Sequence, residues 1–191
     1  MRLPPKPRSR SRACFGVSPL PRPAVLYRRL LRSELEELEA PFVRFLAAQG
    51  IPADEWTKLK VTDEARADQL VDQFSDMVID DVVTRIQHCE QRSERQLLVY
   101  RCGEERLEVR GLLVEGDSAL DLRRDDPPAE MMARLQGSGA RLKLLSAERA
   151  YGEAGRKREL FDLLERGSKI ARSPELFELL DGLTRRQNGA S

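Results

Sequence analysis

Four aspartates recur at every fourth position of one segment, namely Asp68, Asp72, Asp76 and Asp80. On an α-helix this spacing places neighbouring carboxylates about 6 Å apart along one face. With Asp81 beside them, such carboxylates supply the oxygen ligands that Mg²⁺ and Mn²⁺ prefer. The same residues can instead form a solvated acidic face, which attracts a basic partner through complementary charge.

The metal hypothesis needs ligands that this segment does not supply. Helical metal sites normally draw ligands from a second helix, and the sequence has no Glu-x-x-His motif to provide them. We therefore predict no metal ligand and no cofactor, and we assign Asp72, Asp76 and Asp80 to the binding of a basic protein partner. An enzyme that uses the carboxylates of Asp76 and Asp80 with a metal is the alternative.

Other chemistry-bearing residues are few. The chain has one histidine, His88, and three cysteines, Cys14, Cys89 and Cys102, with no C-x-x-C pair. This argues against a zinc cage and a disulfide framework, and it favours reduced thiols in the cytoplasm. We expect His88 near the end of a long helix, and Cys89 and Cys102 as buried apolar residues. No glycine-rich segment has the phosphate-binding pattern of a P-loop or a dinucleotide fold. We predict no catalytic residue and favour a protein that is not an enzyme.

Charge is divided unevenly along the chain. Residues 1–33 hold nine Lys or Arg and no Asp or Glu, whereas the rest holds 24 basic and 32 acidic residues, so +9 and −8 sum to +1. Residues 1–25, rich in Pro, Arg and Ser, are predicted to be a disordered arm. They are also consistent with a mis-called translation start, because valine, as at Val25, can be encoded by an alternative bacterial start codon.

A nucleic-acid binder that acts through the basic N-terminal part of the chain is a further alternative. Arginines could give salt-dependent, sequence-independent affinity for phosphates. The candidates are Arg8, Arg10, Arg12, Arg28 and Arg29.

Periodicity predicts a single α+β domain over residues 26–186, followed by a frayed tail over 187–191. Ser33 is the expected N-cap of a first helix that Pro41 interrupts, and the longest helix is expected from Asp63 to Cys89 after Thr62 as N-cap. Strands are predicted over residues 96–102, 106–114, 119–122 and 141–145. Three further helices are predicted to involve Met131, Leu160 and Leu176. The expected fold is thus helices packed around a small antiparallel sheet, with a long central helix and a helical C-terminus.

Several segments together resemble a small uncharacterised bacterial domain family. They are Tyr27-Arg28-Arg29-Leu30, the helix through residues 42–47, residues 50–56 and Phe74-Ser75-Asp76, and the resemblance covers about residues 26–184. It implies no activity and no catalytic residue. The usual start of the family near Tyr-Arg-Arg-Leu implies that residues 1–24 are extra.

The sequence thus favours a cytoplasmic, non-enzymatic domain that binds another macromolecule. No apolar run approaches the ~20 residues needed to cross a bilayer, so we expect no membrane partner.

Overall fold

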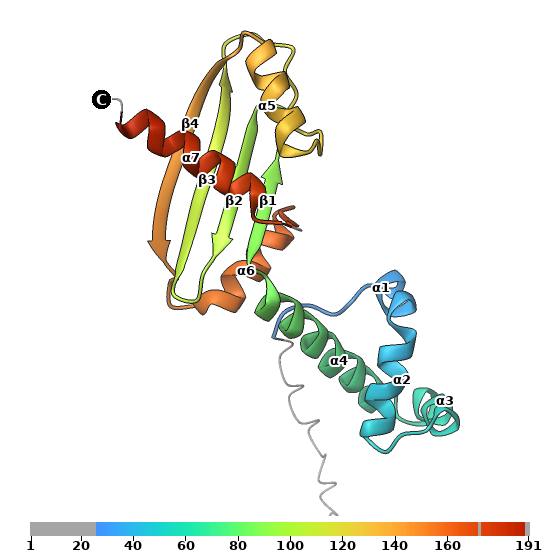
Figure 1. Ribbon diagram of the computed structural model, residues 1–191. Coiled ribbons are helices and arrows are strands. Elements are labelled where there is room, and N and C mark those ends of the chain that lie inside the picture. Colours follow the sequence, from blue (N-terminus) through green and yellow to red (C-terminus); the bar gives the residue numbers. More distant parts are fainter. Residues whose placement is uncertain (1–25, 172, 190–191) are drawn as a thin grey trace, which may run out of the picture.

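The computed structural model describes residues 26–171 and 173–189, so the predicted arm over residues 1–25 lies outside them (Figure 1). The helices in this part of the chain are α1 (Arg32–Glu37), α2 (Glu39–Ala48), α3 (Ala53–Thr62), α4 (Glu64–Arg85), α5 (Pro128–Gly137), α6 (Gly155–Glu165) and α7 (Glu175–Gly189). The strands are β1 (His88–Arg92), β2 (Gln96–Cys102), β3 (Arg106–Glu115), β4 (Arg141–Ala150) and β5 (Lys169–Ile170). The predicted α+β class, with its long α4 and helical C-terminus, is confirmed.

The strands form one antiparallel sheet in the order β4-β3-β2-β1-β5. Helix α7 crosses one face of the sheet, and α5 lies on the same side (Figure 1). Side chains from alternate strand positions, such as Leu97, Val99 and Leu112, pack there against Phe177 and Leu180 of α7. Burial of one face therefore fixes the register of β2 against β3, because a shift by one residue would expose these side chains.

A second core joins the helices to the other end of the sheet. Phe74 and Val83 of α4 pack with Leu160 of α6, and Cys89 and Cys102 of the sheet belong to the same cluster. A smaller cluster joins α2, α3 and α4 around Leu46, Ile51 and Leu70. Helix α4 contributes to both clusters and leads directly into β1, so it connects the helical part of the domain to the sheet.

Two predicted helix starts are wrong by one or two residues. Helix α1 follows Leu31 rather than Ser33, because the Leu31 N–H donates to the Glu34 carboxylate at 2.7 Å. Helix α4 has Asp63, not Thr62, as its N-cap, and the Asp63 carboxylate accepts the Arg66 N–H at 3.0 Å. The predicted interruption by Pro41 is found as the break between α1 and α2 at Leu38.

The predicted extension of the long helix to Cys89 is wrong, because α4 ends at Arg85 and β1 begins at His88. Ile86 and Cys89 continue the apolar spacing of the helix, yet both are buried in extended chain. Residues 88–92 form a strand rather than a helix because they pair with β2, where Tyr100 lies opposite Cys89. His88 is consequently a strand residue, and its ring lies 5.9 Å from that of Phe177.

The predicted strand over residues 119–122 is also wrong, because this segment forms no strand. Leu120 and Leu122 are buried in the core beside α5, and the Leu122 N–H donates to the Glu94 carbonyl at 2.9 Å. The alternation of buried Leu120 and Leu122 with Asp121 is typical of a strand, although this segment has no partner strand in the described part of the chain. Conversely, β4 runs five residues beyond the predicted Leu145, because β3 pairs with it as far as Ala150.

Arg156 of α6 joins the end of α4 to the sheet. Its guanidinium donates to the backbone carbonyls of Val83 at 3.1 Å, Ile86 at 2.5 Å, Cys102 at 3.2 Å and Gly103 at 3.0 Å. A cation at this position also interacts favourably with the partial negative charge at the C-terminus of a helix. One side chain thus supplies hydrogen bonds to carbonyls that the helix and the β2–β3 turn leave unpaired.

Replacing Arg156 by Met should lower the free energy of unfolding by about 3 kcal/mol, because several partly buried carbonyls lose a charged donor. Arg156→Lys should recover only part of this loss, since one ammonium cannot reproduce the planar fork. Urea unfolding followed by circular dichroism measures the effect. The matched control is Arg32→Met, whose side chain is 94% exposed, with an expected change below about 0.5 kcal/mol. Equal stability of the Arg156→Met and Arg32→Met proteins would contradict the assigned role.

Candidate functional site

The four aspartates on α4, here called the acidic ladder (Asp68, Asp72, Asp76 and Asp80), face the segment that precedes α1. The Asp76 carboxylate accepts the backbone N–H groups of Leu26 at 2.9 Å and of Tyr27 at 3.1 Å. Such charge-assisted bonds are stronger than bonds between neutral groups. The acidic ladder therefore holds residues 26–30, which we call the N-terminal segment.

Tyr27 extends this contact toward α6. Its hydroxyl donates to Asp80 at 3.0 Å, and its ring centroid lies 5.1 Å from that of Phe161. Burial first, and then the bond to Asp80, raise the pKa of Tyr27 to about 12. The Lys157 ammonium also donates to Asp80, at 2.8 Å, and this bond is the main reason that the pKa of Asp80 lies below its ordinary value.

Arg29 and Leu30 complete the attachment of the segment. The Arg29 guanidinium donates to Asp72 at 2.6 Å and to Asp68 at 3.1 Å. The Leu30 N–H donates to the Ser75 hydroxyl at 3.1 Å, and this fully buried hydroxyl donates in turn to a carbonyl of α4. Backbone and side chains of the segment are thus bound along α4.

The structure brings together two sets of residues that the sequence analysis assigned to different partners. Arg28 and Arg29, predicted to bind nucleic acid, form ion pairs with Glu34 and Asp72. Asp72, Asp76 and Asp80 remain a predicted partner-binding set, and the three carboxylates have internal partners. Arg8, Arg10 and Arg12 lie outside the described residues.

Sequence analysis missed Lys157, Ser75 and Glu34 as partners in these contacts. The opposite charges of residues 28–29 and of the acidic ladder were the available signal, but the separation of about forty residues or more hid their pairing.

Arg28 and Leu30 of the N-terminal segment also line a groove. It lies between α1, α4 and α6, has a cavity volume of about 340 Å³ and is mostly apolar. Its apolar lining includes Leu30, Leu38, Val78, Ile79, Val82, Phe161 and Leu164, and Val82 is 37% exposed. Glu34, Glu37 and Glu165 lie at the same groove, and Arg28 is the basic residue among those that line it. We call this site the acidic groove.

Arg28 fixes two of these carboxylates. It donates to both oxygens of Glu34 at 2.8 Å and to Glu165 at 3.1 Å. The Arg28 bond is the largest cause that lowers the pKa of Glu34 to about 2. Because one guanidinium faces three glutamates, the groove keeps a negative balance at neutral pH.

A model of a family of unknown function (DUF6495) matches residues 25–185. The chain belongs to this family. No curated protein and no solved structure matches it. The match begins one residue before the described part of this DUF6495 member, and it covers the N-terminal segment, the acidic ladder and the groove. The expectation of membership in an uncharacterised family is confirmed.

Among residues 26–171 and 173–189, no three His, Cys, Asp or Glu side chains are grouped so that they could hold a metal ion. Within those ranges, no helix has both the length and the apolar character needed to span a membrane.

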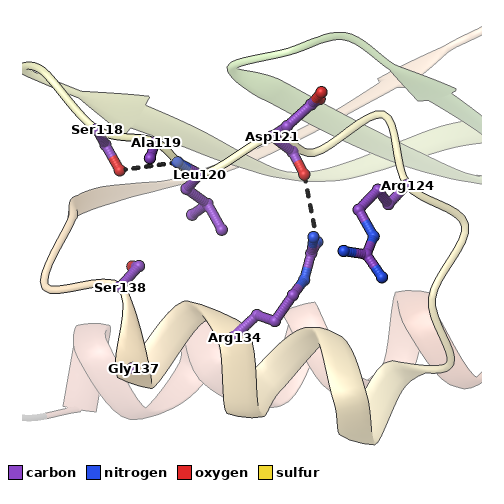
Figure 2. Close-up of a pocket in the computed structure, with 8 residues that line it drawn as sticks. All are labelled: Ser118, Ala119, Leu120, Asp121, Arg124, Arg134, Gly137 and Ser138. Carbon is purple, nitrogen blue, oxygen red and sulfur yellow. Dashed lines mark hydrogen bonds between the residues drawn. The ribbon is translucent and has the colours of Figure 1, made fainter.

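A larger cleft lies between α5 and the loop over residues 118–124 (Figure 2). Its volume is about 520 Å³, and Arg124 and Arg134 point toward it. Arg134 donates to the Asp121 backbone carbonyl at 3.2 Å and pairs with Asp126 at 2.9 Å, while Arg124 pairs with Asp126 at 3.3 Å. Arg134 thus holds the loop on α5, whereas the Arg124–Asp126 pair lies within the connection that precedes α5.

Asp76→Asn should release the N-terminal segment, because one amide oxygen replaces a charged carboxylate that accepts two N–H groups. We expect a loss of about 1–2 kcal/mol in the free energy of unfolding and faster hydrogen exchange at the amides of Tyr27 and Leu30. Asp81→Asn is the matched control, because the Asp81 side chain is 55% exposed and pairs only within α4. If exchange at Tyr27 is unchanged in Asp76→Asn, the ladder does not anchor the segment.

The Arg28–Glu34 pair should also make stability depend on pH. The pKa of Glu34 is about 2 in the fold against an ordinary 4.5. Its contribution is therefore complete above the ordinary pKa and is lost as the pH falls toward the lower one. Since both side chains are 34% exposed, we expect no more than about 1 kcal/mol. Urea unfolding between about pH 5 and pH 2 should show a shallower decline for Glu34→Gln than for the wild type; parallel declines would contradict this.

Proposed function

We propose that this DUF6495 protein is a non-enzymatic interaction domain, and that its acidic groove docks a basic amphipathic helix of a partner protein. The observation that carries the proposal is the combination of an apolar lining with three carboxylates at one groove. An amphipathic helix can place an apolar face in such a groove, with its basic residues directed at the rim.

The acidic ladder has an indirect part in this proposal. Arg28 and Leu30 of the N-terminal segment line the groove, and the ladder holds that segment on α4. Asp72, Asp76 and Asp80 are then positioning residues for one wall of the docking site. This keeps the basic partner that the ladder suggested, but it moves the partner to the adjacent groove.

Two side chains at the groove, one charged and one apolar, support docking of a basic amphipathic partner. Glu37 is exposed and its carboxylate has no ion pair among the described residues, so it can pair with an incoming cation. Val82 is 37% exposed and can be buried further by an apolar side chain, with a gain of roughly 25 cal/mol per Å² of apolar surface. Complementary charge would mainly raise the association rate and the specificity.

We propose the cytoplasm as the compartment of this protein, because thiols such as those of Cys89 and Cys102 stay reduced there.

The test uses a fluorescein-labelled amphipathic helix of Leu and Lys, of about 15 residues, in fluorescence anisotropy. Glu37→Lys and Val82→Glu should each weaken its binding at least about tenfold, which corresponds to 1.4 kcal/mol. The matched controls are Glu36→Lys and Val61→Glu, which make the same changes at side chains of α1 and α3 that are 66% and 85% exposed. These controls should bind the peptide as the wild type does.

Two outcomes would overturn the proposal. Equal loss of binding in the groove variants and their controls would show a general effect of charge. Tighter binding by a protein that lacks residues 1–24 would assign the groove to the basic arm of the chain itself. A Leu/Glu peptide of the same length should not displace the Leu/Lys peptide from the groove.

A further inference from the structure

Strand β4 forms an open edge of the sheet. It is ten residues long, pairs with β3 without interruption from Arg141 to Ala150, and is the last strand in the sheet order (Figure 1). An edge strand presents unpaired N–H and C=O groups at every second residue, and such a row can pair with a further strand. The side chains of β4 from Ser146 onward are exposed, so helices leave this edge accessible.

An apolar pocket lies directly beside this edge, on the face that α5 and α7 cover. Leu142 and Leu144 of β4, Met132 of α5 and Leu183 of α7 line it, and its volume is about 220 Å³. Sites that hold drug-sized molecules have volumes of roughly 300–1,000 Å³, so this pocket suits one or two apolar side chains. A strand added to β4 would direct every second side chain toward this face.

The opposite face of β4 carries two cations near the start of the strand. Because side chains alternate, Arg141 and Lys143 lie on the face away from Leu142 and Leu144. Both cations are exposed, and neither has an ion-pair partner in the described part of the chain. Arg149 lies on their face and pairs with Glu159. A strand added to β4 would therefore be favoured if its side chains on this face were acidic, because opposite charges on paired strands attract each other.

A second copy of the chain fits this edge poorly. Two β4 strands related by a two-fold axis pair nine of their ten residues in the two registers centred on Leu145 or on Ser146, and fewer residues in every other register. The first register places Arg141 opposite Arg149, and the second places Lys143 opposite Arg149, counting equal steps from the centre. Like charges directly opposite each other destabilise a strand pair. The charges thus favour a different occupant.

We infer that the β4 edge binds an extended peptide segment of a partner protein as an added strand, with apolar side chains in the pocket and acidic side chains over Arg141 and Lys143. Backbone hydrogen bonds supply affinity in this mode, and the pocket and the charges supply specificity. The site is separate from the acidic groove and selects a partner of the opposite charge. It does not depend on the function proposed for the groove.

The probe is a fluorescein-labelled, end-capped peptide of about ten residues in which Glu alternates with Leu and Val. Anisotropy should show binding to the wild type, and the double variant Arg141→Glu/Lys143→Glu should bind at least about tenfold more weakly. A peptide with Lys in place of Glu should show the reverse preference. The control Arg44→Glu/Lys60→Glu makes the same charge change on α2 and α3 and should bind as the wild type does. Hydrogen exchange should show new protection at alternate amides of β4.

Several results would overturn this inference. They are equal binding of the Glu peptide by wild type and double variant, protection confined to elements other than β4, and failure of the Glu peptide to bind the folded wild type. Competition by oligouridine that is lost in the same double variant would make the edge a nucleic-acid site instead. A dimer in sedimentation that the peptide dissociates would make a second copy the occupant. Circular dichroism of each variant verifies the fold.

Discussion

Repulsion among the four carboxylates of the acidic ladder is the constraint that organises the helical part of this domain. Like charges four residues apart destabilise a helix, so α4 needs compensation along that face. The compensation comes from Arg29, from two backbone N–H groups bound by Asp76, and from Lys157 on α6. The same contacts attach the N-terminal segment and α6 to α4. The contacts that offset the repulsion within α4 are thus the same contacts that dock the N-terminal segment and α6 on this helix.

The consequence is a groove whose walls come from three distant parts of the chain. Leu30 is held by Ser75, Phe161 is covered by Tyr27, and Arg28 links Glu34 of α1 to Glu165 of α6. Apolar side chains of α4 then form a lining between these walls. At the other end of α4, Arg156 binds the carbonyls that the helix leaves unpaired. Helix α4 is therefore fixed along one face and at its C-terminus, while the strip through Val78 and Val82 stays accessible.

Local sequence patterns predicted much of this fold, but they failed where contacts between residues far apart in the sequence determine the structure. Strand β2 was predicted with its observed bounds, and β3, where apolar and polar residues alternate, was predicted to within one residue. The boundary at His88 was missed because Ile86 and Cys89 continue the three- and four-residue spacing of the apolar residues of the helix. The false strand at residues 119–122 has the burial of a strand without a neighbour to pair with. The attachment of Tyr27 to Asp80 spans 53 residues, and no local pattern can report such a contact.

The two proposed surfaces differ in charge because different ionisable side chains line them. On the helical side, Arg28 lines the groove beside three glutamates, while Arg29 and Lys157 bind aspartates of the ladder. On the sheet side, the exposed edge carries Arg141 and Lys143, and charged side chains on an edge strand discourage pairing between identical chains. The acidic strand that we propose fits this charge pattern, and a second copy of β4 fits it less well. A domain with both surfaces can hold a basic helix and an acidic strand together, because the groove uses α1, α4 and α6 whereas the edge uses β4, α5 and α7.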